Sequence, residues 1–200
     1  MKRISSISFL LLGTIILVAT SCSPTGWNSG TQQDGTKFVS NVIYGSDGRL
    51  DVYQVTDDRL KILADSTVAL IKTSDLQASG LAVSIRGRNY GSDMNLCSTE
   101  KFRDQDTAAF CSGSLVGPDT VLTAGHCIET LADCQSTSLV FGFAVKSASV
   151  LPRSVNSSEV YRCKDIIKTQ RVNDGADFAI IRLDRAVTGH RALGVRPSGD

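Results

Sequence analysis

Residues 110–127 constrain the fold of this 200-residue chain more than any other stretch. Two short apolar runs, 109–116 and 120–123, flank the turn residues Gly-Pro-Asp and predict two β-strands joined by a tight turn. A small Ala-Gly pair then leads to His126 and Cys127, and small residues allow one backbone to approach another closely. The pattern predicts an imidazole held at a fixed place beside a strand pair.

The rest of the chain from residue 66 onward shows the pattern of an all-β protein, with short apolar runs separated by turn residues. Strands are expected over 67–71, 81–85, 108–116, 120–123, 139–145, 160–167 and 178–183, with one or two helical turns over 128–132. Short strands of this number with Gly-rich connections predict a small Greek-key antiparallel β-barrel.

The runs Cys-Ser-Gly-Ser-Leu-Val at 111–116 and Leu-Thr-Ala-Gly-His-Cys at 122–127 closely resemble the histidine region of trypsin-like serine peptidases. Gly125 departs from the alanine that is usual in the family. The resemblance implies that the barrel is the first half of a two-barrel fold, that His126 is a general base, and that Cys111 and Cys127 form a disulfide. Such a bridge closes a loop of about 16 residues, which corresponds to roughly 3 kcal/mol of stabilisation in the chain-entropy model. The alternative is an ordinary core histidine beside a structural disulfide.

The run Asp-Phe-Ala-Ile-Ile-Arg-Leu at 177–183 resembles the family's Asp-x-Ala-Ile-x-x-Leu element. The resemblance implies that Asp177 accepts the Nδ1 proton of His126, fixes the tautomer of the ring and stabilises the imidazolium. Asp174, in the preceding loop, is the weaker candidate. Alternatively, Asp177 only caps a strand.

The third catalytic group of the family, a nucleophilic serine, lies in a Gly-Asp/Asn-Ser-Gly-Gly/Ser turn of the second barrel. That turn does not occur in these 200 residues: Ser198-Gly199-Asp200 has a different order, and Ser112 and Ser114 lie on the barrel of the histidine. We therefore expect the serine to lie beyond residue 200.

The function that this resemblance implies is that of an exported serine-type endopeptidase acting on polypeptides, similar to the bacterial glutamyl endopeptidases. The 200 residues alone are not expected to be active, and their second-barrel face is expected to be apolar, exposed and prone to association. The alternative is a catalytically inactive exported lipoprotein that uses the barrel for binding or scaffolding.

The N-terminal residues read as a targeting segment. Lys2 and Arg3 precede an apolar run over 4–18, and small residues at 19–21 predict a signal peptide over 1–21. Cys22 resembles the lipid-attachment residue of bacterial lipoproteins, with cleavage by the general signal peptidase as the alternative. Residues 22–40 are expected to be a flexible tether, and 41–200 the incomplete peptidase domain. The expected location is an outer-membrane or cell-surface lipoprotein, or a periplasmic or secreted protein, with a membrane contact through the lipid.

Composition and the remaining side chains exclude several other kinds of site. A formal net charge of +1 and few aromatic residues give no reason to expect nucleic-acid binding. Outside the cytoplasm thiols tend to be paired, but the pairing of Cys97, Cys134 and Cys163 is open. Neither a Cys-x-x-Cys motif nor ligand-spaced histidines are present, so no zinc site and no cofactor are expected. His190 is expected to be a surface loop residue without a role.

Overall fold

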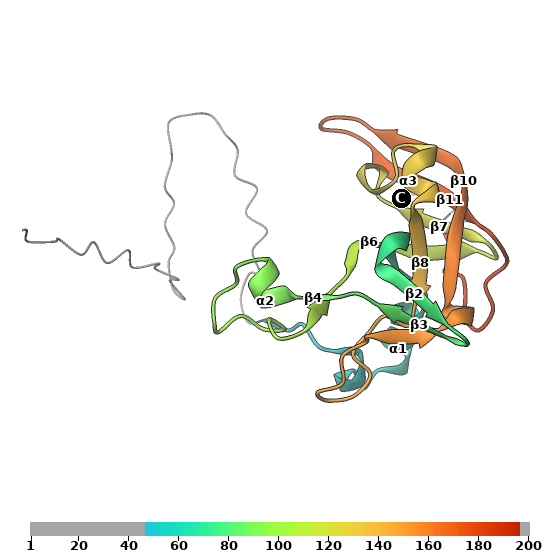
Figure 1. The fold of residues 1–200 in the computed structure, drawn as a ribbon. Coiled ribbons are helices and arrows are strands. Elements are labelled where there is room, and N and C mark those ends of the chain that lie inside the picture. The colour runs from blue at the N-terminus through green and yellow to red at the C-terminus, as the bar shows by residue number, and fades with distance from the viewer. Residues whose placement is uncertain (1–46, 197–200) are drawn as a thin grey trace, which may run out of the picture. The chain divides into compact units, whose positions relative to one another are not determined.

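Six antiparallel strands close into a barrel in the computed structural model, which describes residues 47–196 of the chain (Figure 1). In spatial order they are β1 (Thr67–Lys72), β6 (Ala109–Gly117), β7 (Thr120–Thr123), β11 (Asp177–Leu183), β10 (Val160–Arg171) and β8 (Thr137–Phe141). Strand β7 pairs with β11, the last strand within residues 47–196, and β8 closes the ring against β1. This crossing connection is that of a Greek key. The predicted all-β antiparallel barrel is confirmed.

The barrel interior is filled by apolar side chains from alternate positions of its strands, as the two-residue period of a strand requires. Each large apolar side chain that leaves water in this way stabilises the fold by about 1.5–3 kcal/mol. Core side chains that are fully buried include Val68, Leu70, Leu115, Val121, Leu139, Phe141, Tyr161, Ile181 and Leu183.

The connection between β1 and β6 is long and carries secondary structure of its own. It contains the single-turn helix η2 (Thr73–Asp75), β2 (Leu76–Ser79), β3 (Ala82–Ile85), β4 (Arg88–Asn89), α2 (Tyr90–Asp93) and β5 (Asp106–Thr107). Strands β2 and β3 form a three-stranded sheet with β9 (Ser154–Asn156), while β4 pairs with β5.

The remaining short helices surround the barrel strands. They are η1 (Val52–Gln54), α1 (Asp58–Asp65), η3 (Gly125–Cys127), α3 (Leu131–Gln135) and η4 (Ser157–Glu159). Helix α1 was not expected from the sequence. Asp57 caps it by accepting the backbone N–H of Arg59 at 2.9 Å, and none of its residues is buried.

Element boundaries differ from the predictions in a few places, for local reasons. Strand β8 ends at Phe141 rather than near residue 145, because Gly142 has a φ of +68°, which a strand cannot contain. Helix α3 begins three residues later than expected, where Thr130 caps it. None of the helices within residues 47–196 is long and apolar enough to span a membrane. The predicted signal peptide, tether and Cys22 lie outside the described residues.

A disulfide joins Cys134 of α3 to Cys163 of β10 across 29 residues of chain. Both residues are buried and belong to the main core cluster. This settles the pairing of two of the three cysteines that the sequence left open, and no cysteine among residues 47–196 is free. The bond fixes the helix that follows the histidine segment to the long strand β10.

We expect the double variant Cys134→Ala, Cys163→Ala to lose about 3–4 kcal/mol of unfolding free energy, because the denatured chain gains the entropy of an open loop. Denaturant unfolding of the oxidised wild type and the variant measures this difference. A loss below about 1 kcal/mol would contradict a structural role for the bond.

Candidate active site

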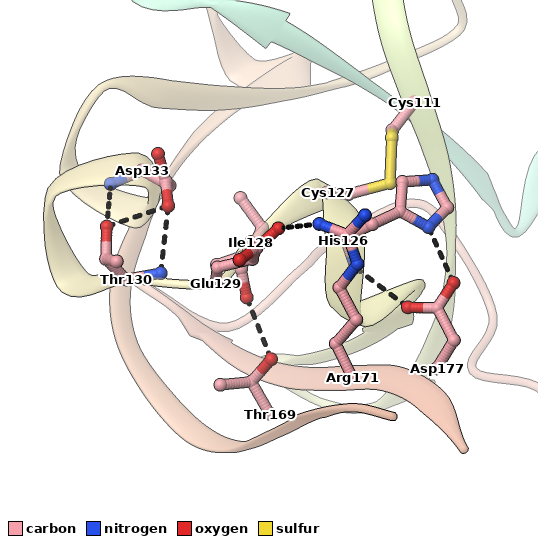
Figure 2. A network of polar contacts seen from close by, with 10 residues as sticks. All are labelled: Cys111, His126, Cys127, Ile128, Glu129, Thr130, Asp133, Thr169, Arg171 and Asp177. Atoms are coloured by element: carbon pink, nitrogen blue, oxygen red, sulfur yellow. Dashed lines mark hydrogen bonds and ion pairs between the residues drawn. A yellow bond between two sulfur atoms is a disulfide. The ribbon is translucent and has the colours of Figure 1, made fainter. Parts of the chain in front are cut away.

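His126 is positioned by the hairpin of β6 and β7 and by the disulfide behind it. Ala124 is extended, and the chain then turns through η3, which carries the histidine and Cys127. Cys127 bonds to Cys111 of β6, with 6.2 Å between their Cα atoms (Figure 2). The short helix is thereby attached to β6 both through the chain and through a covalent crosslink.

Gly125 allows this segment to lie directly against β10. A Cβ atom at this position would stand 2.2 Å from the backbone carbonyl oxygen of Gln170 and 3.0 Å from Oδ1 of Asp177. The first distance is shorter than a carbon–oxygen contact allows, and the second is tighter than most such contacts. The Thr169 hydroxyl on the same strand donates to the carbonyl of Ile128 at 2.9 Å (Figure 2). The histidine segment is therefore held by β10 on one side and by β6 on the other.

Asp177 is the first residue of β11 and contacts His126 twice (Figure 2). Its Oδ2 lies 2.6 Å from Nδ1 of the imidazole, and its Oδ1 accepts the backbone N–H of His126 at 2.8 Å. The pairing of β11 with β7, in which Ala179 lies opposite Thr123, brings the start of β11 to the end of β7. The structure thus brings together two side chains that are 51 residues apart in the sequence.

The contacts of Asp177 favour its ionised form. The side-chain hydrogen bond from His126 and then its backbone hydrogen bond hold the pKa of this carboxyl below its ordinary value of 3.8. Because the pKa is depressed on folding, the resulting stabilisation is present above about pH 3.8 and is lost as the pH falls through the lower folded value. The carboxylate is therefore charged at neutral pH and accepts a hydrogen bond from Nδ1–H, so that the neutral ring carries its lone pair on Nε2.

The opposite edge of the imidazole is open. The side chains of His126 and Asp177 are 51% and 38% exposed, and within residues 47–196 no group is hydrogen-bonded to Nε2. An open, basic nitrogen with its other nitrogen held by a carboxylate is the arrangement of a general base. No described serine reaches it: Ser112 and Ser114 lie within β6, and residues 198–200 are outside the described range.

Other residues near the histidine were not predicted. Arg171, at the end of β10, forms an ion pair with Glu129, the second residue after Cys127 (Figure 2). The partners are 42 residues apart, so no local pattern joins them. Asp174, the weaker sequence candidate, lies in the turn between β10 and β11 with a φ of +58° and has no hydrogen bond to His126.

The sulfur and nitrogen atoms around His126 do not form a metal site. Cys111, His126 and Cys127 have potential ligand atoms within 4.8 Å of one another. Both sulfurs are consumed by the disulfide, and metal binding requires a thiolate.

His190 lies in the loop after β11, but its ring is covered by other parts of the chain. Its side chain is only 8% exposed and contacts two carboxylates, those of Asp65 and Glu159. The residue lies in a loop as predicted, but its ring is not exposed at the surface. The sequence analysis missed this burial because a Gly-His-Arg run with turn character gives no sign of the tertiary contacts that cover the ring.

A cavity of about 820 Å³ borders β6. Its lining is mainly apolar, with side chains from α1, β1, β6 and β8 and from the loop after β8. Representative lining residues are Ile62, Val68, Ala109, Val140 and Phe143. Cys111 and Ser112 of β6 also line it, whereas His126 and Asp177 are not among its lining residues.

We expect Gly125→Ala to lower the free energy of unfolding by about 1–3 kcal/mol, because η3 and β10 must move apart to admit the methyl group. Denaturant unfolding measures the loss. Gly194→Ala is the matched control, since a Cβ there meets nothing within 4 Å. Equal stability of the two variants would contradict the close approach.

Comparison with known proteins agrees with this geometry. The family model described as Trypsin matches residues 94–198. Human chymotrypsin-like elastase family member 3A is 33% identical over 93 residues, which are 45% of this chain and 34% of that protein. Bovine proproteinase E is 32% identical over 76 residues, 38% of this chain and 30% of its own length.

The chain spans about a third of the length of these curated relatives. The solved structure of the Vibrio cholerae VesB protease matches 64% of this chain and 29% of the length of that protease, at 21% identity and a TM-score of 0.35. The family assignment does not depend on this likeness. The family model covers more than half of the sequence, including both His126 and Asp177. The chain therefore belongs to the trypsin family, a lineage of serine peptidases.

Proposed function

We propose that this chain carries the base and the orienting carboxylate of an exported serine endopeptidase. The observation that carries the proposal is the two-point contact of Asp177 with His126, which leaves Nε2 open. Membership of the trypsin family supports a polypeptide substrate. The preference for glutamate at the cleaved bond rests on the sequence resemblance to glutamyl endopeptidases alone.

The proposed reaction is acyl transfer in two stages. Nε2 of His126 takes the proton of a serine hydroxyl as the oxygen attacks the peptide carbonyl carbon, and Asp177 stabilises the imidazolium that forms. The imidazolium then gives this proton to the nitrogen of the leaving amine as the C–N bond breaks, leaving an acyl-enzyme. Water, deprotonated by the same nitrogen, releases the acid and restores the serine.

The serine and the backbone donors for the oxyanion are proposed to come from a second barrel outside these 200 residues. The 820 Å³ cavity and the half-exposed Ile62 at its edge provide an apolar face against which such a barrel would pack. A second barrel that brings its serine to Nε2 of His126 would also cover the exposed His126–Asp177 pair and exclude water from it.

Export is supported by the two disulfides, Cys111–Cys127 and Cys134–Cys163, since such bonds persist in oxidising compartments. The signal peptide at 1–21 and lipid attachment at Cys22 remain part of the proposal, and the lipid would hold the protein at a membrane surface.

A catalytically inactive lipoprotein that uses the barrel for binding is the second candidate. It is favoured by one observation: no Gly-Asp/Asn-Ser-Gly-Gly/Ser turn occurs among these 200 residues. The two candidates make different predictions for the protein encoded by the complete reading frame.

We expect the purified 200-residue chain to remain unlabelled by a serine-directed fluorophosphonate, because the nucleophile is not on it. The protein made from the complete reading frame is expected to be labelled at one serine. Labelling of the short chain at full stoichiometry would overturn the first expectation, and an unlabelled long protein would favour the binding lipoprotein.

In the complete protein we expect Asp177→Asn to lower kcat/KM for peptide hydrolysis on the order of 10⁴-fold, the size of effect found when a triad aspartate is replaced elsewhere. The amide offers no charge to the imidazolium and favours the wrong tautomer. Asp174→Asn is the matched control, since this nearby carboxyl has no bond to His126. Equal losses in both variants would remove Asp177 from the mechanism.

A further inference from the structure

We propose that His190 is a pH-sensitive latch, which holds helix α1 against the barrel when the imidazole is protonated and releases it as the pH rises. The latch is independent of the proposed peptidase chemistry. It consists of three side chains from three separate segments: the C-terminal end of α1, the helix η4, and the chain after β11.

The imidazole of His190 lies between two carboxylates. Nε2 is 2.6 Å from Oε2 of Glu159 in η4, and Nδ1 is 3.0 Å from Oδ2 of Asp65, the last residue of α1. The ring stacks on Phe141 of β8, with 4.3 Å between ring centroids and 17° between planes. With 8% of its side chain exposed, His190 joins two elements that otherwise face different neighbours.

Only the charged ring has a proton for each of the two carboxylates that its nitrogens face. Nδ1 is buried, and its contact with Asp65 does not have hydrogen-bond geometry, so the attraction is that of an ion pair. Burial is the largest single influence on the pKa of His190 and lowers it, but the two carboxylates together outweigh burial and raise the pKa above its ordinary value of 6.5.

The charged groups that face the ring are these two carboxylates. Arg185 is engaged elsewhere, because it donates to the carbonyls of Ser158 and Val160 and its guanidinium lies over the Tyr161 ring. Arg191 follows in the chain and lines the cavity, and Lys61 lies one turn before Asp65 on α1. None of these cations has an ion pair with either carboxylate within residues 47–196.

Deprotonation of His190 would weaken the contact with Asp65 but preserve the contact with Glu159. A neutral ring with its proton on Nε2 keeps the hydrogen bond to Glu159, whose side chain is 32% exposed. Nδ1 then directs a lone pair at the Asp65 carboxylate, and this contact becomes repulsive. Asp65 is 53% exposed and can turn into water at little cost, so the α1 end is the one released.

Apart from the contact with His190, helix α1 is attached to the barrel at its C-terminal end, where the hydroxyl of Thr67 in β1 donates to the carbonyl of Leu63 at 3.3 Å. None of its residues is buried, and Leu60, Ile62 and Leu63 are about half exposed. The following residue, Ser66, is buried and donates its hydroxyl to the carbonyl of Arg191 at 2.7 Å. Because α1 contributes part of the lining of the 820 Å³ cavity, its release would open that apolar surface.

The pH range over which the latch opens follows from the direction in which folding shifts the pKa of His190. A folded pKa above that of the unfolded chain gives stabilisation that is complete below about pH 6.5 and is lost as the pH rises through the folded value. The latch is closed in mildly acidic solution and opens on the alkaline side.

The test combines imidazole titration by NMR with hydrogen exchange of the α1 amides, corrected for intrinsic exchange, in the 200-residue chain. The chain has two histidines, so His126→Gln leaves His190 as the only imidazole. We expect a His190 midpoint above 6.5 and α1 protection that falls through that midpoint. Each unit of elevation corresponds to about a tenfold change in protection.

Asp65→Asn is expected to lower the His190 midpoint and to make α1 protection independent of pH, because the amide can donate to the neutral ring. Asp58→Asn is the matched control on the same helix, where the carboxylate pairs with Lys61 at 3.0 Å. If Asp65→Asn does not fold, Glu159→Gln must still lower the midpoint. The proposal is overturned by a His190 midpoint at or below 6.5 or by hydrogen-exchange protection of α1 that does not change as His190 titrates. It is also overturned if Asp58→Asn changes the midpoint and the protection as much as Asp65→Asn does.

Discussion

The two-point contact between Asp177 and His126 is the interaction on which the candidate site depends. One carboxylate oxygen bonds the ring and the other bonds the backbone N–H of the same residue. The side chain and the main chain of the histidine are therefore fixed relative to a single group. A carboxylate bound only to the ring would leave the backbone free to move, and the direction of Nε2 with it. With both contacts present, the open edge of the imidazole has a defined direction.

That contact exists because the barrel places three strands around one short helix. The β7–β11 pairing carries Asp177 to the end of β7, and the missing Cβ at Gly125 lets β10 approach from one side. The Cys111–Cys127 bond holds the other side to β6. These constraints come from a crossing connection, a glycine and a covalent bond. The rigidity of the site is therefore a property of the barrel, and only its chemistry belongs to the two side chains.

The sequence predicted the parts of this arrangement that are encoded locally. Short apolar runs separated by turn residues indicated the barrel strands, and short motifs around His126 and Asp177 carried the family resemblance. Helix α1 was missed because its apolar stripe, Leu60, Leu63 and Ala64, spans little more than one turn of an eight-residue helix, which is too short to stand out as a helical period. The Arg171–Glu129 pair, the Cys134–Cys163 bond and the surroundings of His190 join residues distant in the chain. Such contacts follow from tertiary packing, which no local pattern specifies.

The two histidines of the chain show how packing decides the chemistry of one residue type. Both imidazoles contact carboxylates. In His126, whose side chain is half exposed, one ring nitrogen contacts a carboxylate and the other has no hydrogen-bond partner within residues 47–196. Both nitrogens of His190 face carboxylates, and its ring is buried against Phe141. A nitrogen with an open lone pair can accept a proton from a substrate or nucleophile, whereas a ring enclosed on both edges can only exchange its proton with solvent when the contacts around it loosen. The first environment suits a base in a reaction, and the second suits a group whose charge controls how two elements are held together.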